Sequence, residues 1–171
     1  MDRVRPAEPG DVGLLAAIEV AAGERFRAVG MDDIADDDPF PDEVLLAAVA
    51  DGRLWVAELE GAVVGYALGE RVGPAGAQHH LEQVSVVPEA GGRGLGAALV
   101  EAVADWARAA GAPSLTLATF RDLPWNGPWY EQLGFATVPD DELDEALRAV
   151  RAHEAELGLD VSLRVCMRRP L

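Results

Sequence analysis

The hydrophobic positions of this chain recur with two different periods, and their succession predicts the order of the secondary structure. Apolar positions that alternate with polar ones, or that run continuously between turn residues, predict strands at 2–6, 53–59, 62–73, 78–88, 113–119, 135–139 and 160–170. Apolar positions three or four residues apart predict helices at 12–22, 41–52, 94–111 and 140–158, with a short helix inside 125–135. Asp11 is placed to cap the first helix, and residues 23–41 form an irregular acidic segment with one or two helical turns.

This order of elements, β-α-α-β-β-β-α-β-α-β-α-β, limits the fold class. Strands dominate the middle of the chain and helices are interspersed. The pattern predicts a mixed, mostly antiparallel sheet of six to seven strands with helices on both faces. The fold class is therefore α/β, of the α+β kind. No repeat, linker or low-complexity segment interrupts the 171 residues, so we expect a single domain over 1–171.

The chain is strongly acidic, with a formal net charge of −16. Non-specific nucleic-acid binding requires a basic surface, so we expect no nucleic-acid partner. The acidity has two interpretations, a solvated surface that keeps the protein in solution or attraction of a cationic substrate such as an amine. The acidic run from Met31 to Glu43 is the best candidate for the second interpretation.

Residue types that are missing or rare exclude several chemistries. Every basic residue is an arginine, so there is no lysine for a P-loop or a pyridoxal Schiff base. The three histidines and the single cysteine, Cys166, match no metal-ligand spacing, so we expect no metal site. We interpret Cys166 as a small buried residue and not as a nucleophile. A lone cysteine fits a reducing compartment, and neither a membrane-spanning run nor a secretion signal is evident; we expect a cytoplasmic protein without a membrane partner.

Four glycines lie between the strand at 78–88 and the helix that starts at about residue 94: Gly91, Gly92, Gly94 and Gly96. Without Cβ atoms, the backbone can adopt positive φ and a ligand can approach its amides. The first N–H groups of a helix lack intrahelical partners and lie at the positive end of the helix dipole, which favours a phosphate or pyrophosphate. Arg93 adds a charge. The alternative is that the glycines only form a tight turn. The spacing is not the G-x-G-x-x-G of dinucleotide-binding folds.

The strand and the loop resemble the cofactor-binding motif of the GCN5-related N-acetyltransferase (GNAT) superfamily, bacterial small-substrate type. There, V-x-V-x-P leads into [R/Q]-x-x-G-x-G/A and a helix; this sequence reads Val84-Ser85-Val86-Val87-Pro88, then Gly91-Gly92-Arg93-Gly94-Leu95-Gly96. Gly91 departs from the family's usual Arg or Gln, so a side-chain contact is lost while the amides remain. Three more segments are similar, in the family's order: VRPAEPGDVGLLAAIE, LWVAELEGAVVGYALG and WYEQLGF, which looks like the family's Y-x-x-x-G-F.

The resemblance implies that acetyl-CoA is the acetyl donor, and it implies which residues bind it. Backbone groups of one strand segment would bind the pantetheine arm: Val84, Ser85 and Val86. Amides of the loop and of the first helical turn would hold the pyrophosphate: Gly91, Gly92, Arg93, Gly94, Leu95, Gly96 and Ala97. Asn126 matches an asparagine that binds pantetheine in many relatives. It lies only four residues before Tyr130, so a helix cap or a turn is its alternative role.

Two residues match catalytic positions of the family. Glu82 stands where some members place a catalytic glutamate, and a raised pKa in a half-buried cleft would suit a general base, acting directly or through water. Its alternative is to bind the substrate ammonium or a neighbouring side chain. Tyr130 matches the tyrosine near the cofactor sulfur and is a candidate acid for the departing thiolate; its alternative is packing. His79 and His80 are secondary candidates for the base, although exposure at a strand start is the simpler expectation.

The resemblance therefore implies transfer of an acetyl group from acetyl-CoA to a primary amine of a small molecule or a protein, by direct attack through a tetrahedral intermediate. Two alternatives stay open. One is a non-catalytic acyl-CoA-binding sensor module, which needs neither Glu82 nor Tyr130, and the other is an acyltransferase for a larger acyl group. The acceptor wall is the family's most variable part, so the acceptor is not implied. The resemblance also allows a homodimer.

Overall fold

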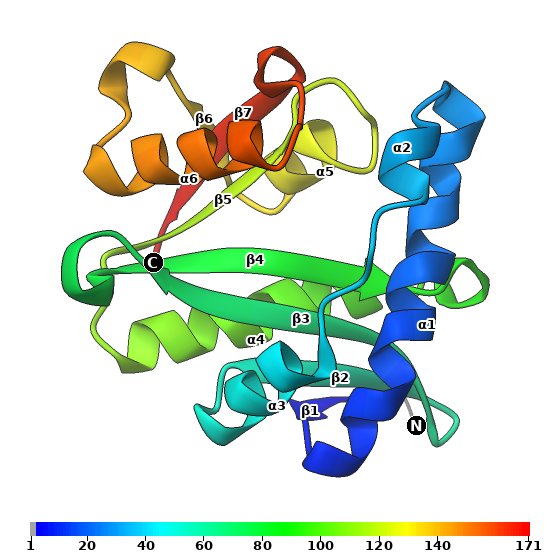
Figure 1. Ribbon diagram of the computed structural model, residues 1–171. Coiled ribbons are helices and arrows are strands. Elements are labelled where there is room, and N and C mark those ends of the chain that lie inside the picture. Colours follow the sequence, from blue (N-terminus) through cyan, green and yellow to red (C-terminus); the bar gives the residue numbers. More distant parts are fainter. Residues whose placement is uncertain (1–2) are drawn as a thin grey trace. The chain divides into compact units, whose positions relative to one another are not determined.

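The computed structural model describes residues 3–171, and its elements follow the predicted order (Figure 1). The strands are β1 (Arg3–Pro6), β2 (Leu54–Leu59), β3 (Ala62–Val72), β4 (Gln78–Val86), β5 (Ser114–Phe120), β6 (Ala136–Val138) and β7 (Arg164–Pro170). The helices are α1 (Val12–Gly23), α2 (Asp32–Ala35), α3 (Asp42–Ala50), α4 (Leu95–Ala109), α5 (Gly127–Gln132) and α6 (Glu145–Glu156). None of the helices within the described residues has the length and apolarity needed to cross a bilayer.

The strands form one mixed sheet in the order β1-β2-β3-β4-β5-β7-β6. The pairs β1·β2, β2·β3, β5·β7 and β6·β7 are antiparallel, whereas β4 and β5 are parallel. The parallel ladder joins His79, His80 and Leu81 to Leu115, Thr116 and Leu117. The predicted mixed, mostly antiparallel sheet flanked by helices is confirmed, with seven strands.

The chain divides into two compact units, and β3, β4 and α4 each run from one unit into the other. The first unit comprises Met1–Gly69 and Gln83–Val103. The second comprises Glu70–Glu82 and Ala104–Leu171. The glycine loop therefore belongs to the first unit, whereas Glu82, Asn126 and Tyr130 belong to the second.

Alternation along β2 and β3 builds the core of the first unit. Leu54 and Val56 face the same side as their cross-strand partners Leu68 and Tyr66. On this side they cluster with buried residues of α1 and α3: Val12, Leu15, Ile18, Leu45 and Ala48. The intervening residues of both strands point to the opposite side and are buried too: Trp55, Ala57 and Ala67. Both faces of this part of the sheet are therefore covered.

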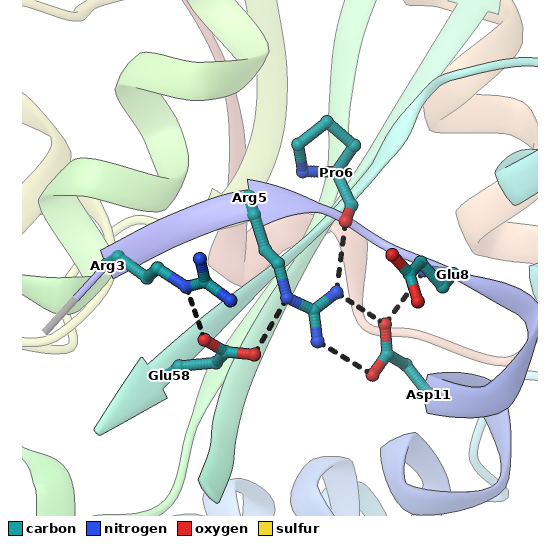
Figure 2. A network of polar contacts seen from close by, with 6 residues as sticks. All are labelled: Arg3, Arg5, Pro6, Glu8, Asp11 and Glu58. Atoms are coloured by element: carbon teal, nitrogen blue, oxygen red, sulfur yellow. Dashed lines mark hydrogen bonds and ion pairs between the residues drawn. The ribbon is translucent and has the colours of Figure 1, made fainter. Parts of the chain in front are cut away.

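An ion-pair network fixes β1 to β2 and to the turn before α1 (Figure 2). Arg5 donates from Nη1 and Nη2 to the two carboxylate oxygens of Asp11, at 2.7 and 3.0 Å, and from Nε to Glu58 at 2.7 Å. Asp11 also accepts the Glu8 amide at 2.8 Å. The predicted cap is wrong. Asp11 directly precedes α1, but within the described residues its side chain makes no capping hydrogen bond to this helix. The Arg5 guanidinium binds the carboxylate instead.

Replacing Asp11 with alanine is expected to lower the free energy of unfolding by about 1–2 kcal/mol, because Arg5 would lose its bidentate partner. The hydrogen bond from Arg5 lowers the pKa of Asp11. This contribution is therefore present above the pKa of the unfolded state and is lost as the pH falls through the folded-state pKa. Urea denaturation at pH 7 measures it. Asp105→Ala is the control, since Asp105 pairs with Arg108 while 69% exposed. Equal losses in the two variants would contradict the expectation.

The second unit is built around β5, β6 and β7, with α6 packed on one face. Val138, Leu143, Leu147 and Cys166 form its buried cluster, against which Ala118 packs. Cys166 has no exposed surface, and burial raises the pKa of its thiol to about 11. The thiolate is therefore scarce at neutral pH. The prediction that Cys166 is a small buried residue is confirmed.

Candidate functional site

The loop between β4 and α4 presents bare backbone to solvent. A 3-10 turn over Pro88–Ala90 leads to Gly91, whose amide donates to the Pro88 carbonyl at 3.0 Å. Gly92 and Gly94 adopt positive φ, 73° and 78°, which L side chains rarely adopt. A Cβ at either position would meet no atom within 4 Å. Glycine is therefore needed at these two positions for the backbone conformation of the loop; a side chain there would have enough space.

Backbone donors gather where the loop enters α4. Within residues 3–171, the N–H groups from Gly92 to Ala97 donate to no group of the chain; the first bond of the helix runs from the Ala98 amide to the Gly94 carbonyl, at 3.0 Å. Gly92, Arg93 and Gly94 are exposed. Unpaired donors at the positive end of a helix dipole form a site for an anion. A turn alone would not require them.

The segment of β4 before the loop lies very close to the backbone of β3. A Cβ at Gly65 of β3 would lie 2.8 Å from the carbonyl oxygen of Ser85, so only glycine fits there. The Val87 amide donates to the Val64 carbonyl at 2.9 Å. Ser85 is buried, and its hydroxyl accepts from the Gln83 side chain at 2.9 Å. The backbone of the predicted pantetheine segment is thus fixed by β3, and sequence reasoning missed the part that Gly65 plays.

Glu82 lies on β4 immediately before that segment and keeps 38% of its side chain exposed. Burial by surrounding protein atoms, and then the charge of Glu70, raise the pKa of its carboxyl. Glu154 adds to this effect, whereas His153 and Arg164 oppose it. The exposed part of the Glu82 side chain can be reached from solvent, while the protein atoms packed around the rest of it raise the carboxyl pKa. Glu82 is accordingly both reachable and more basic than an ordinary glutamate.

His79 and His80 are buried, at 7% and 2% exposure, and the expectation that both are exposed is wrong. The reason is that β4 is an inner strand of the sheet, so both of its faces are covered. The His79 ring packs edge-on against Trp106, with ring centroids 4.4 Å apart. His80 points to the other face, where its Nδ1 lies 2.8 Å from the Thr116 hydroxyl and its Nε2 lies 3.9 Å from Glu82 Oε2.

Tyr130 lies on α5 and is 9% exposed. Its ring makes edge contacts with Trp129 and Phe135, at centroid distances of 4.9 and 5.8 Å. Burial raises the pKa of its phenol, against a smaller opposing effect of Arg164. The phenol therefore stays protonated at neutral pH and can give up its proton only to a strong base. Tyr130 thus packs against its neighbours, and this packing is compatible with a role of its phenol as an acid.

Asn126 stands directly before α5 and shapes the turn through its backbone. Its amide donates to the Leu123 carbonyl at 2.9 Å, and its carbonyl accepts the Tyr130 amide at 3.0 Å. Within the described residues, the Asn126 side chain makes no capping hydrogen bond to α5. The side-chain Oδ1 is buried and has no partner among residues 3–171. A buried acceptor without a partner is costly unless a ligand supplies the donor, so the turn explains the backbone of Asn126 but not its side chain.

Among residues 3–171, no group of three His, Cys, Asp or Glu side chains is arranged to hold a metal ion.

Comparison with known proteins assigns the family. Residues 15–135 match the model of the acetyltransferase (GNAT) family, a span that contains the glycine loop, Glu82 and Tyr130. The chain belongs to the GNAT acetyltransferase family. The resemblance noted in the sequence motifs is thereby confirmed.

Several solved structures of other proteins share this fold. The N-acetylglutamate synthase of Neisseria gonorrhoeae, complexed with coenzyme A and N-acetyl-glutamate, matches with a TM-score of 0.72 and 22% identity over 100% of this chain, which spans only 35% of the synthase. The PaiA N-acetyltransferase of Thermoplasma acidophilum, complexed with coenzyme A, gives 0.67 and 12%, covering 100% and 99% of the two chains. The ribosomal-protein-S18-alanine N-acetyltransferase of Escherichia coli gives 0.65 and 17%, covering 99% and 94%. At these identities the likeness establishes the fold.

Proposed function

We propose that this GNAT protein transfers an acetyl group from acetyl-CoA to a primary amine of a small molecule or a protein, by direct attack through a tetrahedral intermediate. The observation that carries the proposal is the set of unpaired amides from Gly92 to Ala97, in a chain of an acetyltransferase family. Two similar structures, the gonococcal synthase and PaiA, are complexes with coenzyme A. Coenzyme A has the pyrophosphate that such a set of donors fits.

Three sets of groups in the chain would bind coenzyme A. The amides of Gly92, Arg93, Gly94, Leu95, Gly96 and Ala97 would hold the pyrophosphate. The Gly91 amide already donates to the Pro88 carbonyl, so, contrary to the expectation from the sequence, Gly91 would not donate to the pyrophosphate. Backbone groups of Val84, Ser85 and Val86 would bind the pantetheine arm. The unpaired Oδ1 of Asn126 would accept a hydrogen bond from a pantetheine amide.

Glu82 would serve as the general base. An amine attacks a thioester only through its lone pair, so the ammonium must first lose a proton. A partly exposed carboxyl with a raised pKa is suited to take that proton near neutral pH, directly or through one water. The nitrogen then forms its bond to the acetyl carbon, and the bond between that carbon and sulfur breaks as the tetrahedral intermediate collapses. The nitrogen gives up its second proton in this collapse, and that proton would restore the Tyr130 phenol after the phenol has protonated the sulfur.

Tyr130 would protonate the sulfur that leaves. Because burial keeps the phenol protonated, its proton is available at neutral pH, and a developing thiolate is a base strong enough to attract it. The edge contacts with Trp129 and Phe135 would hold the ring in one orientation.

Replacing Tyr130 with phenylalanine is expected to lower kcat about 100-fold, the lower end of the range for general acid catalysis. The ring contacts are kept, so the Kd for coenzyme A should change less than twofold. Steady-state thiol release measures kcat, and calorimetry measures Kd. Trp129→Phe is the control for ring packing in the same helix. A normal kcat in the Tyr130 variant would remove the phenol from the mechanism.

The function as a whole is tested by thiol release. Purified protein is mixed with acetyl-CoA and a panel of amines that includes amino acids and peptides with a free N-terminus. These classes follow the names of the two similar enzymes, N-acetylglutamate synthase and ribosomal-protein-S18-alanine N-acetyltransferase. Release of coenzyme A together with an acetylated amine is the expected result. Saturable binding of acetyl-CoA with no release for any amine would favour a sensor module instead.

A further inference from the structure

Thr116 of β5, His80 of β4 and Glu82 of β4 form a series of polar groups in which His80 is within hydrogen-bond distance of Thr116 and lies 3.9 Å from Glu82. His80 and Glu82 are two residues apart on one strand, so their side chains share a face. Thr116 is the direct cross-strand partner of His80 on β5. His80 Nδ1 lies 2.8 Å from Thr116 Oγ1, which donates to the His79 carbonyl at 3.3 Å. His80 and Thr116 are 2% and 1% exposed, so no bulk water competes for these bonds.

This series favours one tautomer of His80. The Thr116 hydroxyl has one proton, and its geometry fits donation to the His79 carbonyl at 3.3 Å. With that bond made, the hydroxyl oxygen is left to accept from His80, which favours the tautomer with its hydrogen on Nδ1. Burial lowers the pKa of His80 to about 4, and the ring is neutral at pH 7. Nε2 then has a lone pair, and it faces the Glu82 carboxyl at 3.9 Å.

We propose that His80, oriented by Thr116, presents a hydrogen-bond acceptor to Glu82 and thereby favours the protonated form of that carboxyl. A separation of 3.9 Å is too long for a direct bond, but one bridging water or a small rotation of the exposed Glu82 side chain closes it. An acceptor satisfies the O–H of a protonated carboxyl and offers nothing to a carboxylate. The proton that leaves the amine resides on Glu82, and none has to move onto His80.

His80 and Thr116 are thus positioning residues, and their effect on rate rests on the proposed function of Glu82 as base. Other charged groups act on Glu82 from the surrounding elements: Glu70 of β3, His153 and Glu154 of α6, and Arg164 of β7. Their charges are untouched by substitutions of His80 or Thr116. A shift in the Glu82 pKa that follows such a substitution is therefore due to the acceptor.

The test begins with a spectroscopic measurement that needs no substrate. In protein labelled with 15N-histidine, the imidazole nitrogens of His80, identified by their loss in His80→Leu, are expected to be protonated at Nδ1 and unprotonated at Nε2 at pH 7. In protein labelled with 13C-glutamate, the Glu82 carboxyl is titrated, with Glu82→Gln for assignment. Thr116→Val and His80→Leu are expected to lower the Glu82 pKa by about one unit.

Two control variants separate this effect from general damage to the core. Thr116→Ser keeps the hydroxyl and should keep the wild-type pKa of Glu82. Thr119→Val replaces a threonine of the same strand that is also buried, at 4% exposure, but that points to the opposite face, and it should have no effect. Thr116→Val is nearly isosteric, so it preserves the test if His80→Leu fails to fold.

An activity profile adds the link to function. The acid limb of kcat/KM against pH should move to lower pH in Thr116→Val and not in Thr119→Val. A proton on Nε2 of His80, or an unchanged Glu82 pKa in Thr116→Val, would overturn this inference and leave the proposed function intact. Absence of acetyl transfer with every amine, together with the expected tautomer and pKa shift, would instead count against the proposed function alone.

Discussion

Replacing Glu82 with glutamine is expected to lower kcat/KM about 10²- to 10³-fold at pH 7, the range typical for loss of a general base. Glutamine keeps the shape of the side chain and removes only its ability to accept a proton. In the proposed mechanism the carboxylate of Glu82 is the active form and is lost as the pH falls, so its raised pKa would set the acid limb of the wild-type profile. That limb should disappear from the variant. The deficit should shrink at high pH, where the free amine is already unprotonated.

A matched variant strengthens this test. Glu70→Gln removes the neighbouring charge that raises the Glu82 pKa, so its acid limb should move to lower pH while the maximal rate stays within a factor of about two. The pH profile of thiol release with a fixed amine measures both variants. If Glu82→Gln retained both the rate and the acid limb, Glu82 would not be the base.

Replacing Gly94 with valine is expected to raise the Kd for coenzyme A about 100-fold. The positive φ of 78° costs an L side chain about 1–2 kcal/mol and more for a β-branched one. Relaxing that strain would change the orientation of the amides at the start of α4. Each hydrogen bond from an amide to a charged oxygen contributes about 1.5–3 kcal/mol, so the loss of one or two accounts for the expected change.

Gly111→Val is the control for Gly94→Val. Gly111 has a φ of 75° and no atom within 4 Å of an added Cβ, so the two substitutions impose the same backbone strain. Gly111 follows the end of α4, not its start. Both variants should lose similar stability in urea denaturation, but only the Gly94 variant should lose affinity for coenzyme A in calorimetry. Equal affinities would remove the loop from the binding site.

The sequence predicted the elements well because they depend on local patterns. The alternation on β2 and β3, the stripe of α4 and the glycines before it are each legible within a short window, and the structure has all of these elements. The unpaired amides at Gly92 and Gly94 were predictable for the same reason, because a positive φ and the start of a helix depend on no distant residue.

Features that depend on distant partners were not predictable. Asp11 has the right type and place for a helix cap, but Arg5 and the position of Glu58 on β2 decide where its carboxylate points. The link between His80 and Thr116 depends on the register of two parallel strands, which no local pattern reveals. The close approach of Gly65 to Ser85 depends in the same way on how β3 lies against β4.

The acidic segment illustrates the same limit. Arg27 pairs with Glu24, Asp32 and Asp36, so part of the negative charge is neutralised within the segment itself. Glu19 of α1 accepts hydrogen bonds from the Phe40 amide at 3.2 Å and from the buried Tyr66 hydroxyl at 2.6 Å. These bonds hold the end of the acidic segment against α1 and β3. Charge counting alone reveals neither contact. Attraction of a cationic acceptor by the remaining carboxylates stays a prediction.

The central claim is that bare amides at the start of α4 bind the pyrophosphate of coenzyme A. The most direct measurement is a 1H–15N NMR titration of the protein with coenzyme A. The account predicts saturable shifts of the amides from Gly92 to Ala97, the same midpoint for all of them, and no comparable shift of Gly111. Saturable binding of coenzyme A that leaves those amides unmoved, or no binding at all, would contradict it.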